Sequence, residues 1–542
     1  MKKLLIGILL LAGLLAGLAF GLELYFEKRI SQLINSSSTR KYDLLFENIS
    51  VTLLKGNVSL EKIRLVPLDA TSSTKVSGSL ISIELSGVSF LDLLFNRKLT
   101  IDRVLLYEPG FRLIQKEVQG RPEDNSEALQ GVFQDIISRG VISNFELRNG
   151  TAEFLVQVDS IRPFAHFKDL NISAEGIISD SVIVQNLVPF QVESIQISLK
   201  NLLVNLPNKQ SFKLGTMEFD SEAKKIVFQD IALKYEDWEE TVKMMVYQSD
   251  VVEFTLKSLS LSYIDEKNSI YGNWQIIAGL AAFDSLIIDD YRDKNKPRPD
   301  EPEKPLFEGM IEQIPFPIYL DTIRISNSKV VYRELLPGQS SPIVFNFGNL
   351  TSEIINVIST DSLQKDLNLK IQANAIFNEI APLQLDILSP YDLGSYSVQA
   401  RISGFELSEL NDLLERIANV KVSSGKVHSV YLQMEGSRFS SSNHLTFDYE
   451  DLKLEILGKD HSKNKLKTTL ANMLTSKSNM PTSAKYKIAA YQTKRNISRG
   501  PFNLIWESTK DGLIQIVPSD VGSIVRSKMK CNNLIPGNEK KS

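Results

Sequence analysis

The sequence predicts a mainly β protein, in which an N-terminal transmembrane helix precedes an elongated, curved antiparallel β-sheet groove with a few short helices. Three observations lead to this prediction. An uncharged apolar segment, Leu4 to Leu22, opens the chain. Apolar and polar residues then alternate in many stretches, as in GSLISIELSG from Gly78 to Gly87, which is typical of strands with one dry and one wet face. Finally, an order of strands and linkers recurs along the chain, which is typical of structures built by repetition.

The composition is that of a folded chain without a strongly charged partner. The 542 residues are 43% hydrophobic and 23% charged, and 61 Lys and Arg against 65 Asp and Glu give a net charge of −4. No basic block is present, so we expect no nucleic-acid partner. Cys531 is the only cysteine, which excludes an intrachain disulfide and a metal site built from cysteines.

The apolar segment from Leu4 to Leu22 is about as long as a helix that crosses a bilayer. Lys2 and Lys3 precede it, so the amino terminus is expected in the cytoplasm and the bulk of the chain on the far side of the membrane. The alternative is a cleaved signal peptide, because Gly17 and Ala19 form a weak small-x-small site. We favour an uncleaved single-pass anchor, since the apolar run continues past that site. Representative anchor positions are Leu4, Leu10, Leu15, Phe20 and Leu22.

Strict alternation recurs well beyond Gly87, separated by Gly, Asn, Asp and Pro turn signals, which is typical of antiparallel sheet with one solvated side. The apolar members of these stretches are the candidates for lining a groove. They are Ile81, Ile83, Leu85, Leu259, Leu261, Tyr263, Leu369, Ile371, Val398, Val430, Leu432, Met434, Leu452, Leu454 and Ile456.

Helical spacing is rare and short. It occurs at Phe90 to Phe95, at Trp274 to Leu280 and at Ser408 to Val420, where Ser408 is the expected N-cap. Pro501 is expected to open an amphipathic helix that packs on its own protein. The predicted apolar side of that helix carries Phe502, Ile505, Trp506, Leu513 and Ile516.

The chain contains an internal repeat. GVFQDIIS (Gly131 to Ser138) aligns with GMIEQIPF (Gly309 to Phe316), and at the same offset FELRNGTAEF (Phe145 to Phe154) aligns with IRISNSKVVY (Ile323 to Tyr332). FKDL and FGNL follow the two copies. One-sided strands can close on each other as sandwiches, or form one sheet whose apolar face awaits a ligand. The repeat favours the second arrangement, because units stacked edge to edge give a continuous trough.

Residue patterns that carry chemistry are missing from the sequence. The four histidines, His166, His428, His444 and His461, include no pair at metal-ligand spacing. There is no Gly-x-Ser-x-Gly elbow, P-loop or dinucleotide glycine pattern. We interpret the carboxylates of FDYEDLKLEIL as a solvated strand edge. We therefore expect no enzymatic activity, no cofactor and no metal.

Two regions resemble the AsmA-like proteins of the Gram-negative envelope. The family's amino-terminal signature is similar to three stretches of this chain: the anchor, ENISVTLLKGNVSLEKIRLVP (Glu47 to Pro67) and NRKLTIDRVLLYEPGFRLI (Asn96 to Ile114). The carboxyl-terminal part of the family is similar to Val422 to Leu457. The matching positions are Leu99, Ile101, Val104, Leu106, Pro109, Gly425, Tyr449 and Leu452.

The resemblance implies a single-pass protein of the bacterial inner membrane, with most of its chain in the periplasm. It also implies a repeating β-groove that conducts phospholipid toward the outer membrane, with phospholipids, the inner membrane and envelope or outer-membrane proteins as partners. The alternative is a non-catalytic envelope scaffold or assembly factor built from closed β-sandwich units. The expected domains are an anchor (1–22), a linker (23–40), a first groove repeat (41–180), connecting strands (181–250), a second repeat (251–360), an AsmA-like β region (361–460) and C-terminal helices with a polar tail (461–542).

Overall fold

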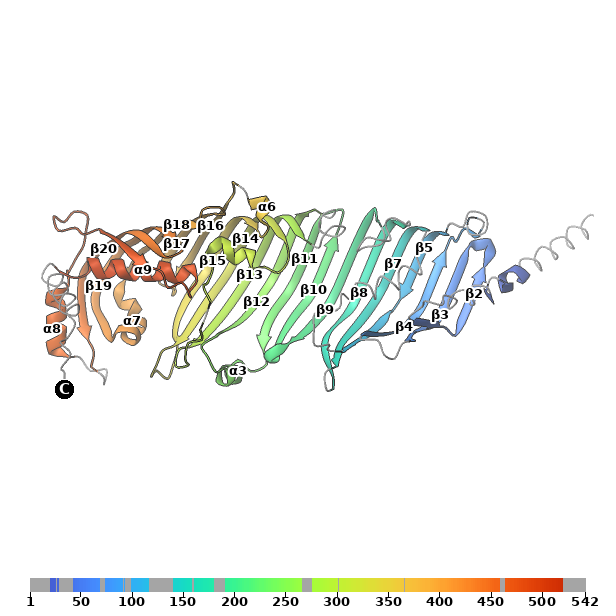
Figure 1. The fold of residues 1–542 in the computed structure, drawn as a ribbon, viewed down its shortest axis with the longest axis horizontal. Helices are drawn as coiled ribbons and strands as arrows, with labels where there is room; N and C mark the ends of the chain where they lie inside the picture. Colours follow the sequence, from blue (N-terminus) through green and yellow to red (C-terminus); the bar gives the residue numbers. More distant parts are fainter. Residues whose placement is uncertain are drawn as a thin grey trace, which may run out of the picture. The chain divides into compact units, whose positions relative to one another are not determined.

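The computed structural model describes residues 20–25, 27–28, 42–68, 74–90, 92, 99–116, 140–157, 160–179, 191–265, 275–300, 302–364, 366–458 and 464–519. Within these ranges, 21 strands belong to one sheet and the helices are few and short (Figure 1). This confirms the prediction of a mainly β fold. Anchor residues Leu4, Leu10 and Leu15 lie outside the described residues, whereas Phe20 and Leu22 lie in a short exposed helical stretch.

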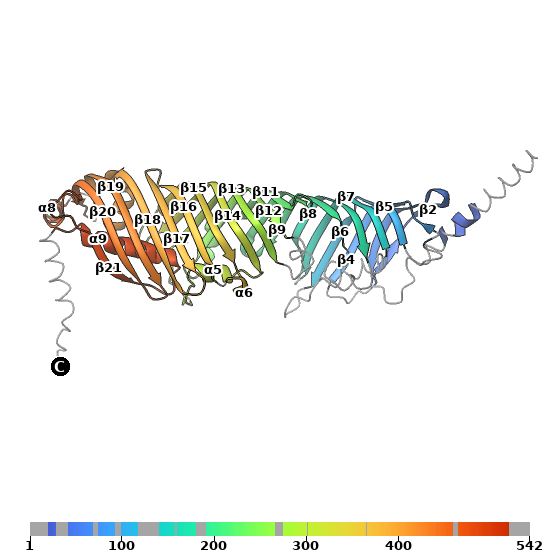
Figure 2. The same ribbon diagram turned by 90° about the horizontal axis from the view of Figure 1, so that it is seen from above.

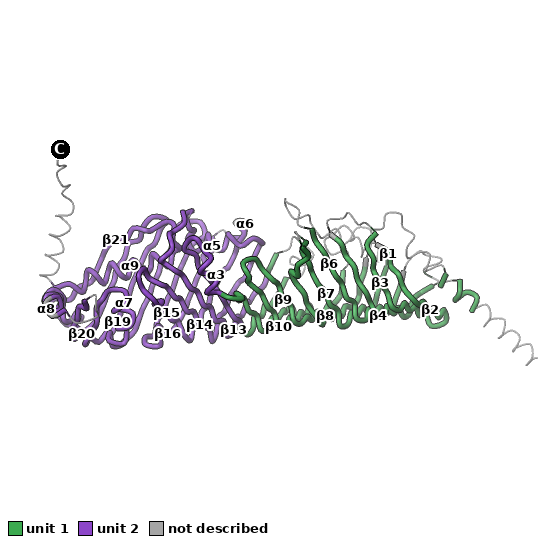
Figure 3. Tube along the Cα trace, turned by 90° about the horizontal axis from the view of Figure 1, so that it is seen from below, with its two compact units in different colours: residues 1–237, 257–277 green, residues 238–256, 278–542 purple. Residues whose placement is uncertain are grey.

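Two compact units divide the chain (Figure 3). Unit 1 comprises residues 1–237 and 257–277, and unit 2 comprises residues 238–256 and 278–542. The strands of unit 1 are β1 (Tyr42–Leu45), β2 (Asn48–Thr52), β3 (Asn57–Pro67), β4 (Thr74–Ser86), β5 (Leu99–Tyr107), β6 (Gly110–Lys116), β7 (Gly140–Gln157), β8 (Ile161–Ser179), β9 (Ser194–Leu206), β10 (Gln210–Asp220) and β11 (Lys225–Tyr235). Its two short 3-10 turns are η1 (Leu53–Lys55) and η4 (Pro207–Lys209). Both units contain parts of β12 (Asp250–Ile264) and β13 (Ile276–Asp293).

Neighbouring strands of unit 1 mostly pair antiparallel in chain order, from β7 through β8, β9 and β10 to β11. The exception is β7, which pairs parallel with both β5 and β6. Glu108 and Pro109 separate β5 from β6, and Thr151 donates its backbone N–H to the Pro109 carbonyl. The sheet is therefore mixed, where the sequence predicted an antiparallel one.

Long strands of unit 1 share a backbone irregularity part of the way along their length. One residue adopts the left-handed conformation, with φ 51° at Lys62, 56° at Asn149, 52° at Asp169, 53° at Asn201 and 55° at Asp230. Such a residue shifts the alternation by one position, as in a β-bulge. We call these five positions the kink line. Asn and Asp tolerate the left-handed region better than other residues that carry a Cβ, which explains why four of the five are Asn or Asp.

Unit 2 carries the remaining strands and the longer helices. The strands are β14 (Ile318–Leu335), β15 (Ile343–Ile358), β16 (Asn368–Phe377), β17 (Ala381–Pro390), β18 (Ser395–Glu406), β19 (Val420–Ser437), β20 (Ser440–Ile456) and β21 (Ala489–Lys494). From β14 to β21 each strand pairs antiparallel with the next. The helices are α3 (Trp238–Met244), α5 (Phe307–Glu312), α6 (Asp361–Gln364), η5 (Leu407–Leu410), α7 (Asn411–Ala418), α8 (Lys465–Leu474) and α9 (Pro501–Ile516).

Two of the helix predictions need correction. The segment predicted as a helix from Trp274 to Leu280 is strand from Ile276 onward, where β13 begins, and Trp274 lies outside the described residues. Ser408 is not the cap of the predicted helix at 408–420, since it lies inside η5 and α7 begins at Asn411. The predicted helix at Phe90 to Phe95 lies largely outside the described residues.

The helix predicted to begin at Pro501 is present as α9, which packs on β19, β20 and β21 (Figure 2). Its buried side agrees with the predicted one at Ile516, which is fully buried, and differs at Phe502 and Trp506. Phe502 and Trp506 are 53% and 48% exposed. The buried positions are Pro501, Leu504, Ser508, Gly512 and Ile516. Small residues occupy two of these positions because the helix lies so close to the sheet that larger side chains would not fit.

Candidate functional site

One face of unit 1 carries continuous rows of apolar side chains that run from strand to strand. Register pairing places Ile172 of β8 opposite both Leu147 and Ile197, and Phe219 opposite Ile197. A second row joins Leu199, Met217 and Phe228. Because paired residues lie on the same face of a sheet, we call this side the apolar face of unit 1.

The apolar face of unit 1 is incompletely covered on β9. None of the 13 residues of β9 is buried, although its sequence, SIQISLKNLLVNL, has seven apolar side chains. Within the described part of unit 1, no helix packs extensively against β9. Near β3 and β5 the face is better covered, because Val58, Ile101 and Ala174 form a buried cluster against which Ile195 packs.

Two predicted groove residues do not lie on the apolar face, and left-handed backbone positions explain both: one lies opposite Lys62 of the kink line, and the other adopts that conformation itself. Ile81 is 49% exposed, whereas Leu80 is buried with Leu60 and Ile63, and Ile83 packs against the same cluster. The alternation therefore changes phase between Leu80 and Ile83, opposite Lys62. Tyr263 is also misassigned, since it adopts a φ of 60° and is 74% exposed.

In unit 2 the corresponding face is closed by the protein's own helices. Leu432 and Met434 of β19 are 1% and 2% exposed, and Leu445 of β20 is fully buried. A Cβ atom added at Gly512 of α9 would lie 2.9 Å from Leu445 Cβ and 2.5 Å from the Tyr491 hydroxyl. The helix and the sheet are therefore in direct contact.

Six predicted groove residues belong to this closed core. They are Leu369, Val398, Val430, Leu432, Met434 and Leu452. Another seven are half-buried, namely Ile83, Leu85, Leu259, Leu261, Ile371, Leu454 and Ile456. All six buried residues lie in unit 2, whereas the half-buried ones occur in both units, with Ile371, Leu454 and Ile456 in unit 2.

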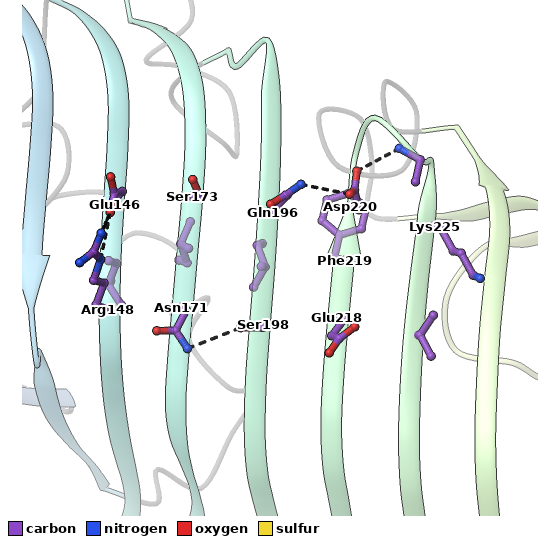
Figure 4. Close-up of a pocket in the computed structure, with 15 residues that line it drawn as sticks. Glu146, Arg148, Asn171, Ser173, Gln196, Ser198, Glu218, Phe219, Asp220 and Lys225 are labelled. Carbon is purple, nitrogen blue, oxygen red and sulfur yellow. Dashed lines mark hydrogen bonds and ion pairs between the residues drawn. The ribbon is translucent and has the colours of Figure 1, made fainter.

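Polar side chains border a hollow of about 650 Å³ on strands β7 to β11 (Figure 4). They come from positions on either side of the apolar row, so they face away from it. Gln196 donates to an Asp220 oxygen at 3.1 Å, and Arg148 and Arg103 both pair with Glu146. Burial acts to raise the pKa of Glu146, but the hydrogen bond from Arg148 and the charge of Arg103 lower it overall. These polar groups pair with one another, and the same hollow is also lined by Leu147, Ile172, Ile197 and Phe219 of the apolar row.

A charged cluster that the sequence reasoning missed lies on β12, β13 and β14 of unit 2. The Arg292 guanidinium forms two hydrogen bonds of 2.5 Å with the Asp250 carboxylate. Lys294 pairs with Glu334 at 2.7 Å, and the Tyr332 hydroxyl donates to Glu334 at 2.7 Å. The signal in the sequence was the pair of charged motifs IIDDYRD and YREL, in which charged residues interrupt apolar strands.

Asp290 belongs to the same cluster but lacks a full set of partners. Its Oδ1 atom is shielded from solvent and accepts no hydrogen bond. Asp289, its neighbour in the sequence, pairs with Arg333, and the Arg333 guanidinium lies over the ring of Trp238. These three residues are on the face of β13 opposite to Asp290. Burial, and then the negative charge of Asp250, raise the pKa of Asp290 to about 7.

Aromatic side chains continue from this cluster along the same face of unit 2. Tyr332 stacks on Phe345 with ring centroids 6.2 Å apart, and Phe345 lies 6.5 Å from Phe377. Trp506 of α9 meets Phe345 edge-on at 5.9 Å. Tyr332, Phe345 and Phe377 are only half-buried. We call these three residues the aromatic row.

The described residues contain no group of three or more His, Cys, Asp or Glu side chains arranged to hold a metal ion. His428 contacts Glu450 across neighbouring strands at 2.9 Å. Among the residues that the structure describes, no helix has the length and apolar character needed to cross a bilayer. The chain matches neither a known protein-family model nor any curated protein.

Proposed function

We propose that this protein binds the acyl chains of phospholipids along its apolar sheet faces and supports phospholipid transport in a bacterial envelope. In this proposal the apolar strand faces form an elongated, curved groove and the N-terminal apolar segment anchors the chain in the inner membrane. The bulk of the chain lies in the periplasm. The resemblance to AsmA-like proteins points in the same direction.

The observation that carries the proposal is the difference in burial between β9 and β19. Both strands place apolar residues on one face. On β19 those residues are buried because α9 and the neighbouring strands cover them, whereas β9 has no buried residue at all. The apolar side chains of β9 are half-buried, so part of their surface stays accessible, and accessible apolar surface that runs on from strand to strand typically marks a binding surface.

Acyl chains fit this surface for an energetic reason. Burial of one methylene group stabilises a complex by about 0.8 kcal/mol, so a sixteen-carbon chain gains on the order of 10 kcal/mol by leaving water. A face several strands wide with no polar groups in its rows supplies such an environment. The apolar segment from Leu4 to Leu22 would hold this face close to a bilayer, where acyl chains are the abundant apolar solute.

Photo-crosslinking in intact cells tests the proposal on the full chain. A photoreactive residue at Leu199, on the apolar face of unit 1, should capture phospholipid that is detected by mass spectrometry. The same residue at Lys200, the next residue of β9 and on the opposite face, is the matched control and should capture none. Absence of lipid at Leu199, or equal capture at both positions, would contradict the proposal.

A scaffold function is the second candidate, and the closed region around α9 favours it. There the sheet and α9 form an ordinary protein core, with Leu445 and Ile516 fully buried. A scaffold predicts that a photoreactive residue at Leu199 captures a protein rather than lipid. The same experiment therefore separates the two functions.

A further inference from the structure

The turn η1 of unit 1 presents an apolar side chain to its surroundings on a fixed base. Leu53 packs inward against the buried cluster that contains Val58. Leu54, the next residue, is 90% exposed, more than any other large apolar side chain among the described residues. Gly56 ends the turn with a φ of 66°, and its carbonyl accepts the Val88 backbone N–H at 2.8 Å. These contacts hold the turn, so Leu54 projects from a defined place.

Two glutamates of the short helical stretch at residues 20–25 and 27–28 are bonded to this turn and to β2. Glu23 Oε1 accepts the Leu53 backbone N–H at 3.0 Å, and Glu27 Oε1 accepts that of Val51 at 3.2 Å. The glutamates are four residues apart, so they share one face of the helical stretch. Among the described strands, only β3 pairs with β2. The helical stretch therefore lies along β2, where its carboxylates accept backbone N–H groups as a neighbouring strand would.

The same helical stretch continues the uncharged apolar segment of the sequence. Glu23 is the first charged residue after Lys3. Four exposed apolar side chains surround Glu23, and such a group marks a surface that an apolar partner covers; they are Phe20, Leu22, Leu24 and Tyr25. Since the proposed function places Leu4 to Leu22 in a bilayer, Glu23 lies at the boundary of that bilayer. The hydrogen bond from Leu53 to Glu23 brings η1 to the same level.

We propose that η1 is a second point of membrane contact, at which Leu54 inserts into the bilayer surface and the Lys55 ammonium binds lipid phosphate. This inference rests on the proposed function, since it uses the anchor, and it adds a surface of unit 1 that touches the membrane. A leucine beside a lysine suits the bilayer surface, where apolar side chains reach the acyl chains and basic ones reach the headgroups. The backbone suits it also, because Glu23 and Glu27 already bind N–H groups that would lack water there.

Anionic lipid should strengthen this contact. Lys55 is the last residue of η1 and is exposed. One lysine near an anionic membrane surface favours the bound state about fivefold. The insertion of Leu54 depends on apolar burial and not on the charge of the lipid. The two residues can therefore be tested separately, Leu54 by its depth in the bilayer and Lys55 by the response to lipid charge.

The test uses the full chain in vesicles of phosphatidylcholine, with and without an equal part of phosphatidylglycerol. Cys531→Ser removes the only cysteine, so a nitroxide can be attached at Leu54→Cys or, as the matched control, at Ser143→Cys on an exposed position of β7. Electron paramagnetic resonance should show that the label at position 54 collides more with oxygen than with a water-soluble nickel chelate. The label at position 143 should show the reverse. Phosphatidylglycerol should raise the ratio of inserted to aqueous label at position 54 about fivefold, and Lys55→Ser should abolish this rise.

Other outcomes would overturn the inference. A label at position 54 that reports water in both kinds of vesicle would do so, and so would one shielded from oxygen and nickel alike, which indicates cover by protein such as a second copy of the chain. A rise with phosphatidylglycerol that survives Lys55→Ser would refute the phosphate contact. An aqueous label at position 54 together with phospholipid captured at Leu199 would refute the inference and leave the proposed function standing. An inserted label with no lipid captured at Leu199 would support the membrane contact and refute the binding of acyl chains along the sheet.

Discussion

Asn149 of β7 and Asn327 of β14 adopt the same left-handed backbone conformation, with φ of 56° and 50°, although they lie in different units. The register with the following strand is irregular at both positions. The two residues also align in the internal repeat found in the sequence. In the following strands, Asp169 and Asn349 from the aligned FKDL and FGNL segments adopt φ of 52° and 48°. The repeat thus conserves the position at which the strand changes phase.

Replacing Asn149 by Val should therefore destabilise unit 1. A β-branched residue in the left-handed region costs about 1–2 kcal/mol or more relative to Asn, whereas Asn149→Gly should be nearly neutral. Ser143→Val, at an exposed position of the same strand, is the control. Thermal unfolding of the three variants checks this, and equal losses for Asn149→Val and Ser143→Val would refute the role of the backbone conformation.

Sequence reasoning captured the alternation but not the phase changes. Leu432 and Met434 follow simple alternation and are buried as a strand face should be. Ile81 fails because the chain changes phase opposite Lys62, and the sequence carries no distinctive signal there. At Asn149 the dipeptide Asn-Gly looks like an ordinary hairpin turn, yet it lies within a strand of 18 residues. Only the neighbouring strands determine which interpretation holds.

The charged cluster was out of reach for a related reason. In IIDDYRD the carboxylates resemble a solvated edge, because alternation alone does not say which face is covered. The pairing of Asp289 with Arg333 shows on which face of the sheet Asp289 lies, and Asp290, the next residue, therefore lies on the opposite face. That pairing joins residues on different strands. Long-range pairing of this kind cannot be derived from one sequence.

The contrast between covered and uncovered faces predicts unequal costs for the same substitution. Leu432→Ala should destabilise unit 2 by about 2–5 kcal/mol, because the side chain is fully enclosed and leaves a cavity. Leu199→Ala should cost about 1 kcal/mol or less, since Leu199 is only half-buried. Urea unfolding of both variants provides the measurement. A large loss for Leu199→Ala would mean that its face is closed by protein and would count against the groove.

Gly512→Ala should loosen α9 from the sheet. The added methyl group would lie 2.5 Å from the Tyr491 hydroxyl and 2.9 Å from Leu445 Cβ, so the helix must move or the strands must yield. Overpacking of this kind costs about 1–3 kcal/mol. Lys510→Ala, on the exposed side of the helix, should change stability by about 0.5 kcal/mol or less. Limited proteolysis near residues 495–500 reports release of the helix, and identical digestion of the two variants would contradict close packing.

The raised pKa of Asp290 makes the stability of unit 2 depend on pH. A carboxyl group whose pKa is near 7 in the folded state and near 4 in the unfolded state binds its proton more tightly when folded. Stability therefore falls as pH rises from about 4 to 7 and stays level above that range. Because Asp290 is only partly buried, we expect a loss of about 1–2 kcal/mol.

Asp290→Asn removes this titration and keeps the size of the side chain. The variant should match the wild type at pH 4.5, where Asp290 is protonated in the fold, and should be more stable at pH 8 by the same amount of about 1–2 kcal/mol. Asp289→Asn is the control, because it removes the partner of Arg333 and should destabilise at both pH values. Urea unfolding at pH 4.5, 6 and 8 gives the comparison. A stability difference between Asp290→Asn and wild type that is the same at all three pH values would show that Asp290 is not the group that titrates, and its unpartnered oxygen would then need another explanation.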